Sequence, residues 1–271
     1  MIAAVWGLGG LGLLFGLLLG IAARIFAVNK DSKAEEILEL LPGANCGACG
    51  FPGCSGLAAA IVRGEASPAA CTVCGSDAAE TIAQILGIEV AAEDCQIARL
   101  ICRGGDSQVG LQADYAGLND CRSAKAFGFG GKACTFGCLG LGNCARACPF
   151  GAISMGSDSL PRIDRELCTG CGVCVAACPQ SVLELVPKPN RVFVACSSTA
   201  PGRKVRQVCK VGCIACRICE KVCEPEAIKV ENNIARIDYS KCNNCGRCAE
   251  KCPRGIIINE LADQYSASAV G

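Results

Sequence analysis

Cysteines recur two or three residues apart along much of this chain, and histidine is absent. The 271 residues include 26 cysteines and no histidine. A disulfide scaffold is also rich in cysteine, but such close spacing suits metal chelation better than pairing between distant segments. The lack of histidine excludes a Rieske centre and Cys2His2 zinc, so that all-thiolate sites remain. The cysteine pattern therefore predicts several metal-cluster sites.

Three stretches have the regular spacing Cys-x2-Cys-x2-Cys-x3-Cys, which is typical of bacterial ferredoxin loops. Proline follows directly in two of them and is displaced to Pro225 in the third. A short apolar stretch follows each of these loops and also the irregular loop described next, and we expect a small strand at each of the four stretches. In ferredoxins with two clusters, three cysteines of a loop bind one cluster and the fourth binds the other. The spacing therefore predicts [4Fe–4S] clusters whose ligands cross between loops.

The chain also contains an internal repeat. RIDRELCTGC at residue 162 returns as RIDYSKCNNC at residue 236. A fourth loop has irregular spacing and contains Cys134, Cys138, Cys144 and Cys148. A shift of 75 residues superposes these four on Cys209, Cys213, Cys219 and Cys223. The irregular loop has Leu141 where its duplicate has Cys216. We expect Cys134, upstream in the irregular loop, to replace the missing ligand. A lost cluster or a three-iron cluster is the alternative.

These loops define two tandem two-cluster modules, residues 131–187 and 188–262. The predicted ligand sets of the first module are Cys134, Cys138, Cys144 with Cys178, and Cys168, Cys171, Cys174 with Cys148. Those of the second module are Cys213, Cys216, Cys219 with Cys252, and Cys242, Cys245, Cys248 with Cys223.

A fifth set of cysteines lies in an N-terminal domain, residues 29–90. Its spacing is Cys46-x2-Cys49-x4-Cys54-x16-Cys71, with glycines that let the backbone wrap closely around anionic sulfurs. Four thiolates suit a [4Fe–4S] cube, and structural zinc is the alternative. Helices are expected over 31–41, 55–63 and 76–86. The sequence thus predicts five [4Fe–4S] clusters held by twenty cysteines.

The N-terminus, residues 1–28, reads as a transmembrane anchor. From Ile2 to Ala23 it has 22 residues without a charge, about 33 Å as a helix and enough to span a bilayer. A cleaved signal peptide is the alternative, but no Lys or Arg precedes the run. Arg24 and Lys30 follow it, so the positive-inside rule places the cluster domains in the cytoplasm. Glycines at 12, 16 and 20 form a stripe that favours a membrane partner helix.

Six cysteines remain outside these sets, and two segments have no cluster motif. Cys74 is a spare thiol or a substitute ligand. Residues 91–130 are expected to be a linker segment and residues 263–271 a disordered tail. We expect Cys95, Cys102 and Cys121 to be buried thiols that pack as small apolar groups. The alternative is a sixth site that these cysteines form with Cys196 or Cys209.

The order of these features resembles the B subunit of the Rnf electron-transport complex. An apolar anchor is followed by ELLPGANCGACGFPGC, a second helix with IAQILG, and then the ferredoxin modules. A similar small domain occurs in corrinoid iron–sulfur proteins, but the anchor and modules extend the match over nearly the whole chain. The expected fold is α+β: a transmembrane helix, a small helical [4Fe–4S] domain and two tandem two-cluster ferredoxin-like modules.

The resemblance implies a single-pass protein of the bacterial plasma membrane. It would accept electrons from soluble reduced ferredoxin and relay them to membrane partner subunits of an ion-translocating ferredoxin:NAD oxidoreductase. No catalytic residue is expected on this chain, and no credible nucleotide-binding loop is present. The alternatives are the electron-input subunit of another membrane-bound reductase or hydrogenase, and a zinc-stabilised membrane scaffold.

Charge adds one further expectation. The net charge of +1 gives no indication of nucleic-acid binding. One segment, however, has eight basic residues and a single acid, Glu220. Such a segment would steer an acidic ferredoxin into contact, or it is a solvated linker. The basic residues are Lys188, Arg191, Arg203, Lys204, Arg206, Lys210, Arg217 and Lys221.

Overall fold

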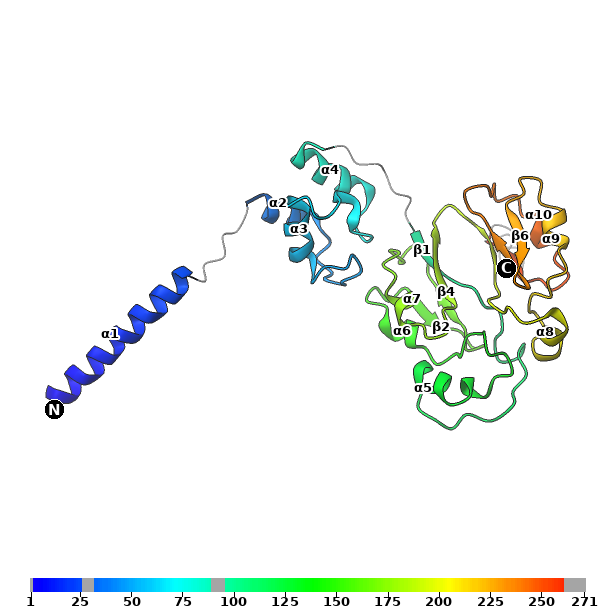
Figure 1. Ribbon diagram of the computed structural model, residues 1–271, viewed down its shortest axis with the longest axis horizontal. Coiled ribbons are helices and arrows are strands. Elements are labelled where there is room, and N and C mark those ends of the chain that lie inside the picture. Colours follow the sequence, from blue (N-terminus) through cyan, green and yellow to red (C-terminus); the bar gives the residue numbers. More distant parts are fainter. Residues whose placement is uncertain (1, 26–31, 89–95, 261–271) are drawn as a thin grey trace, which may run out of the picture.

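The computed structural model of the chain describes residues 2–25, 32–88 and 96–260 (Figure 1). It begins with helix α1 (Ile2–Ile25), whose side chains are described without interruption only over residues 9–22. Large apolar side chains of α1 are exposed, among them Leu13 at 76% and Leu19 at 69%. Among the described residues, we found no helix both long and apolar enough to cross a membrane.

A small helical domain follows. Its apolar residues meet at Ile37, Leu57 and Ile82, which are fully buried. Gly87 caps the last helix with a φ of 69°. This left-handed backbone conformation costs little free energy in glycine, which has no Cβ. The helices predicted over 55–63 and 76–86 are confirmed, whereas the predicted start at residue 31 lies outside the described residues. The elements are α2 (Ser32–Leu40), α3 (Cys54–Val62), η1 (Pro68–Ala70) and α4 (Ser76–Leu86).

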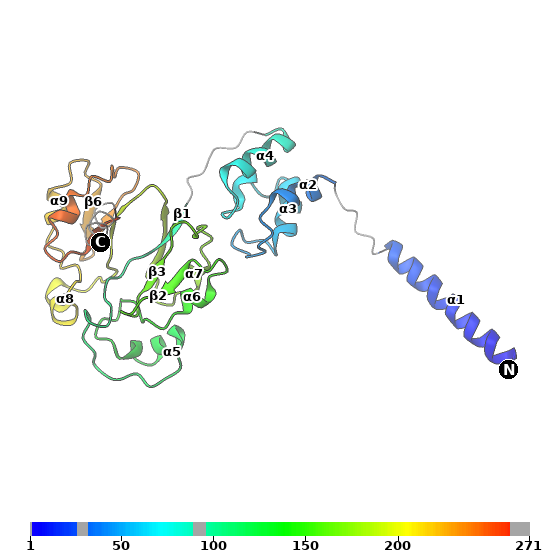
Figure 2. The same cartoon turned by 180° about the vertical axis from the view of Figure 1, so that it is seen from behind.

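The first ferredoxin-like module starts earlier than expected. Strand β1 (Gln96–Leu100) pairs antiparallel with β4 (Leu183–Pro187). Strands β2 (Ile153–Met155) and β3 (Pro161–Ile163) form a hairpin, and β1 lies beside β3 (Figure 2). The described part of the segment predicted to be a linker is therefore built into the module. A five-residue strand with so distant a partner has too little periodicity to be recognised in the sequence.

Short helices connect these strands. Between β1 and β2 the chain passes through α5 (Cys121–Ala126), η2 (Phe129–Gly131) and α6 (Asn143–Ala147). Helix α7 (Val173–Ala177) precedes β4. Figure 1 shows α6 and α7 close together beside the strands, with α5 on the loop below them.

The second module repeats the arrangement. Strand β5 (Val192–Val194) pairs antiparallel with β8 (Ile257–Asn259), as β1 does with β4. Strands β6 (Ile228–Glu231) and β7 (Ile234–Ile237) form the second hairpin. The strands predicted after the four cysteine loops are thus confirmed as β2, β4, β6 and β8. The helices of this module are α8 (Gly202–Val208), α9 (Ile218–Lys221) and α10 (Arg247–Glu250).

A buried arginine joins the two modules. Arg99, on β1, is 3% exposed and donates to the Asn190 carbonyl at 3.2 Å and to the Glu260 carboxylate at 2.9 Å. Its guanidinium also lies 4.4 Å from the centre of the Phe193 ring, a distance typical of cation–π contacts. Arg165 binds the same carboxylate at 2.7 Å. Arg99 and Arg165 belong to the first module and their partners Asn190, Phe193 and Glu260 to the second, so these contacts hold the two modules against one another.

Candidate metal centres

In each ferredoxin-like loop, the third cysteine stands at the second position of a short helix. The residue before each helix has a left-handed backbone, with φ between 58° and 76°. A helix that starts at such a turn leaves free N–H groups at the loop, and these suit anionic sulfur. The irregular loop thus has the same local geometry as the three regular ones. The third cysteines, each 9% exposed or less, are Cys144, Cys174, Cys219 and Cys248.

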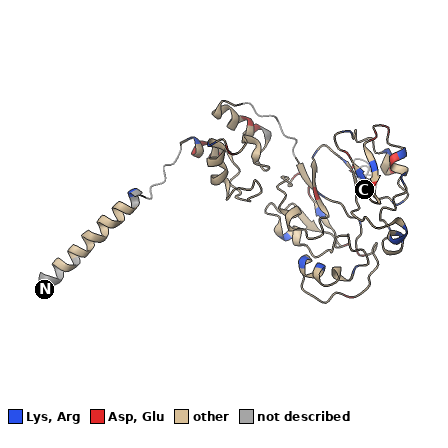
Figure 3. Cartoon of the chain, in the orientation of Figure 1, with Lys and Arg blue, Asp and Glu red and all other residues tan. Residues whose placement is uncertain are grey.

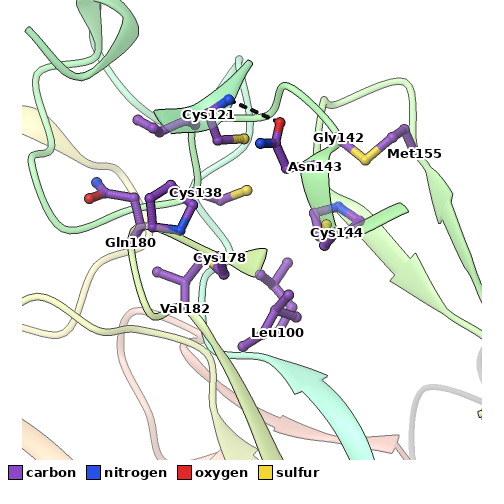
Figure 4. A pocket seen from close by; sticks show the side chains of 14 residues that line it. Leu100, Cys121, Cys138, Gly142, Asn143, Cys144, Met155, Cys178, Gln180 and Val182 are labelled. Carbon is purple, nitrogen blue, oxygen red and sulfur yellow. Dashed lines mark hydrogen bonds between the residues drawn. The ribbon is translucent and has the colours of Figure 1, made fainter. Parts of the chain in front are cut away.

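A hollow in the first module is lined by four cysteines (Figure 4). Three of them, Cys138, Cys144 and Cys178, belong to one predicted set. The fourth is Cys121, the first residue of α5, and Cys134 is not among the lining residues. Burial raises the pKa of Cys144, and the nearby Cys178 and Cys121 thiols raise it further. Cys121, and not Cys134, therefore lies with three cysteines of the predicted set around this hollow.

A hydrogen-bond network holds Cys121 at this hollow. The Asn143 side-chain oxygen accepts from the Cys121 N–H at 3.0 Å (Figure 4). The Asn143 side-chain nitrogen donates to Asp120 at 2.6 Å. Asp120 caps α5 by accepting from the Ser123 N–H at 2.8 Å. These hydrogen bonds, foremost that from Ser123, lower the pKa of Asp120 to about 2. In the sequence, an aspartate before a short helix is a capping signal, but it does not show what the helix packs against.

The other site of the first module gathers the cysteines that the sequence predicted. Burial raises the pKa of Cys174 to about 12, and the Cys168, Cys171 and Cys148 thiols are among the neighbours that raise it further. The sulfur of Cys168 accepts a hydrogen bond from the Ala98 N–H at 3.4 Å. Strand β1 therefore supplies an amide donor to this site, which was not expected of a linker.

The second module follows its predicted pairing at both sites. A hollow is lined by Cys213, Cys216, Cys219 and Cys252, the full predicted set. At the other site, burial raises the pKa of Cys248 to about 11. Its neighbouring thiols, which raise the pKa further, are those of Cys223, Cys242 and Cys245.

The N-terminal domain brings its cysteines together around α3. Cys54 and Cys71 are buried in the apolar core, and Cys49 packs against it. Burial raises the pKa of Cys71, and the Cys49 and Cys54 thiols act in the same direction. Asn45, which sequence reasoning did not single out, accepts from the Cys54 N–H at 2.8 Å.

Cys46 and Cys74 have different surroundings in this domain. Cys46, the first predicted ligand, is half-buried in the loop before α3. Cys74 donates a weak hydrogen bond to the Leu40 carbonyl at 3.8 Å. Burial, helped by the Cys71 thiol, raises the pKa of Cys74 to about 11. The Cys74 thiol is thus hydrogen-bonded to the last residue of α2.

The cysteines present fit a [4Fe–4S] group. Two hollows each have four thiols among their lining residues, and the only other side chains there that could bind a metal are the thioether of Met155 and the amides of Asn143 and Gln180. Within the described ranges, no three Cys, Asp or Glu side chains gather closely enough to hold a single metal ion. The sites are therefore defined by the hollows that the thiols surround.

A third hollow corresponds to the sixth site that the sequence left open as an alternative, with a different set of cysteines. It is lined by Cys102, Cys134, Cys196 and Cys209, and Cys134 had been assigned to another site. Cys95, the remaining unassigned cysteine, lies outside the described residues.

Comparison with family profiles matches three parts of the chain. A profile described as a putative Fe–S cluster matches residues 41–73, and a 4Fe–4S binding domain matches residues 161–184. A 4Fe–4S dicluster domain matches residues 212–256. Ferredoxin-type 4Fe–4S domains are thus present in both modules.

Curated relatives match almost the whole chain. The B subunit of the Na⁺-translocating ferredoxin:NAD⁺ oxidoreductase complex of Acetobacterium woodii is 46% identical over 94% of this chain and 76% of its own length. The B subunit of the ion-translocating oxidoreductase complex of Methanosarcina acetivorans is 42% identical over 92% of this chain and 95% of its own. The B subunit of the proton-translocating ferredoxin:NAD⁺ oxidoreductase complex of Clostridium ljungdahlii is 42% identical over 91% of this chain and 88% of its own length.

Proposed function

Because this chain belongs to the family of B subunits of ion-translocating oxidoreductase complexes, we propose that it takes electrons from reduced ferredoxin and relays them to partner subunits. The chain is an iron–sulfur electron-transfer subunit of such a complex. The finer proposal follows from the relatives' names, which specify ferredoxin and NAD⁺, and from the cysteine sites. Its main support is the pair of four-cysteine hollows at equivalent places in the two modules.

We assign twenty cysteines to five [4Fe–4S] clusters, and nineteen of them are the ligands that the sequence predicted. Bound to thiolates, such a cluster accepts and releases a single electron. The assignment keeps four predicted sets, and in the fifth Cys121 joins Cys138, Cys144 and Cys178. The chain's own residues shape each site: thiols provide the ligands, backbone N–H groups bond to sulfur, and apolar side chains exclude water.

The proposed ferredoxin-docking surface is the exposed face of α8. Val205 is buried on the inner side of this helix, while Arg203, Lys204 and Arg206 are exposed on its outer side. Figure 3 shows this helix as a blue segment on the second module. A cluster of positive charge raises the association rate of an acidic partner and loses this effect as salt screens it.

Stopped-flow oxidation of reduced ferredoxin by the complex tests this surface. Arg203→Glu with Arg206→Glu should lower the second-order rate about tenfold or more at low salt, and wild type should slow steeply as salt rises. Lys229→Glu with Arg236→Glu is the matched control, because both residues are exposed on the hairpin β6–β7. A salt-independent rate, or equal slowing by both pairs, would rule out docking at α8.

We further propose that α1 anchors the chain in the membrane, with the cluster domains on the cytoplasmic side. The supports are the uncharged sequence from Ile2 to Ala23, the exposed leucines of α1, and the basic residues that follow. The full chain should then stay with membranes through an alkaline carbonate wash. Leu14→Glu with Leu18→Glu should release it, because two carboxylates in the bilayer are costly. Release of the wild-type chain by carbonate would contradict the anchor.

A further inference from the structure

We propose that Cys102, Cys134, Cys196 and Cys209 hold a sixth [4Fe–4S] cluster at the junction of the two ferredoxin-like modules. The inference rests on the proposed function, since it adds a site to the same relay. None of the matched profiles, which span residues 41–73, 161–184 and 212–256, includes any of these four cysteines.

The hollow that they surround has the size of the other two four-cysteine hollows. Each of the three hollows leaves about 20 Å³ of space for the centre of a water-sized sphere. All four cysteines are free thiols, and three of them, Cys102, Cys196 and Cys209, are 8% exposed. Arg103 provides the one charged side chain among the residues that line it. The donor set is therefore again four thiols in an otherwise apolar and small-residue wall.

Glycines keep the space between the sulfurs open. A Cβ added to Gly137 would lie 3.4 Å from the Cys102 sulfur and 3.5 Å from the Cys134 sulfur. A Cβ added to Gly104 would lie 3.5 Å from the Cys102 sulfur and 3.9 Å from that of Cys209. The sulfurs of three cysteines thus lie within van der Waals reach of these two glycine positions.

The four cysteines form two pairs that the duplication relates. Cys102 lies two residues beyond the end of β1, and Cys196 lies two residues beyond the end of β5. Cys134 and Cys209 are the pair that the 75-residue repeat superposes. Each module thus contributes one cysteine after its first strand and one before its first cysteine loop. The site is built symmetrically from both modules, and neither module completes it alone.

Cys102 and Cys196, the pair that follows the first strands, accept equivalent amide hydrogen bonds in the two modules. The Cys138 N–H donates to the Cys102 sulfur at 3.3 Å, and the Cys213 N–H donates to the Cys196 sulfur at 3.4 Å. A second amide, that of Gly104, donates to Cys102 at 3.4 Å. Amide donors favour a charged sulfur ligand. Thiols that only fill apolar space would need no such donors.

The junction is closed around the hollow by backbone contacts between the modules. The Arg103 N–H donates to the Ala195 carbonyl at 3.0 Å, and the Gly110 N–H donates to the Val208 carbonyl at 3.0 Å. The side chain of Val205 in α8 lines the hollow and is 1% exposed. The proposed cluster would therefore lie beneath the basic helix, between the sites of the two modules.

Metal and sulfide analysis of the full chain tests the proposal. Six clusters require about 24 iron atoms and as many sulfides per chain, against about 20 for five. Cys102→Ala and Cys196→Ala, which come from different modules, should each lower both values by about four. The double variant should lose no more than either single variant, because both residues serve the same cluster. Cys74→Ala is the matched control and should keep the wild-type iron content.

Three results would overturn the sixth site. They are about 20 iron atoms in the wild-type chain, unchanged iron in both single variants, or one zinc per chain that is lost from both variants. The wild-type count needs no variant, so it decides the question even if a substitution prevents folding. A chain without any iron would instead refute the proposed function, and the two failures are thereby distinguished.

Discussion

The two ferredoxin-like modules share one topology but complete their equivalent sites differently. In the second module, Cys216 lies within the loop beside Cys213 and Cys219, and all three line the hollow. In the first module Leu141 occupies that position, and Cys121 reaches the hollow from α5. The comparison shows that four thiols can surround such a hollow whether or not three of them come from one loop.

A second difference lies where a cysteine loop meets the first strand. In the first module, Gly170 has a φ of 70°, and a Cβ there would lie 2.4 Å from the Gln96 carbonyl oxygen. The repeat places Asn244 at this position in the second module, with a φ of 59°. Its side-chain oxygen accepts from the Arg191 and Val192 N–H groups at 2.9 and 3.3 Å. Backbone contact in one module is thus replaced by a side-chain bridge in the other.

The largest expected effect comes from exchanging the ligand source. Cys121→Ala should remove one cluster, about four iron atoms and four sulfides per chain. Adding Leu141→Cys should restore them, because it recreates in the first module the regular spacing of the second. Iron and sulfide analysis of the purified full chain measures both changes.

The same substitution discriminates between the two candidate ligands. Leu141→Cys should not restore the iron that Cys134→Ala removes, because Cys134 lines a different hollow. If Leu141→Cys rescues Cys134→Ala and leaves Cys121→Ala deficient, the assignment of Cys121 is refuted.

The next largest effect is expected at the loop–strand contact. Gly170→Ala forces a side chain into the left-handed region and against the Gln96 carbonyl, and should lower the free energy of unfolding by about 2 kcal/mol. Asn244→Gly, at the equivalent position, introduces no clash and removes an acceptor, so its cost should be nearer 1 kcal/mol. Denaturant unfolding under anaerobic conditions compares the two variants. Equal stability of Gly170→Ala and wild type would contradict the close approach.

The smallest effect is expected from the network that positions Cys121. Asn143→Ala removes the acceptor for the Cys121 N–H and the donor to Asp120. Loss of such an outer partner should speed iron loss to a chelator about tenfold, with the initial iron content unchanged. Ile218 occupies the equivalent position of the second module, so Ile218→Ala is the matched control and should leave the rate at its wild-type value. Identical rates for the two variants would show that the network has no positioning role.

Much of the site was readable from spacing. Three regular loops predicted their ligand sets, and the duplication revealed that the irregular loop belongs to the same series. These signals are local, because in each regular loop three predicted ligands lie within a few residues of one another. The short strands after the loops were predicted for the same reason, since each apolar stretch follows a cysteine motif directly.

The predictions that required correction concern segments without a local signal. Strand β1 pairs with β4, more than 80 residues later, and residues 91–130 therefore appeared to be a linker. The separation between Cys121 and Cys138 likewise matches no cluster motif. Cys134 was chosen as the replacement ligand because it is near in sequence, although the folded loop directs it to another hollow.

The sequence by itself determined the all-thiolate chemistry, the duplicated modules and the ligands that stand at regular spacing. These properties depend on residue type and on separations of two or three positions, which the covalent chain preserves in any conformation. The tertiary structure alone decided that Cys121 lines the hollow of the irregular loop and that four other cysteines line a hollow between the modules. Those groupings depend on how strands pair and how modules pack, because contacts between distant segments arise only when the chain folds.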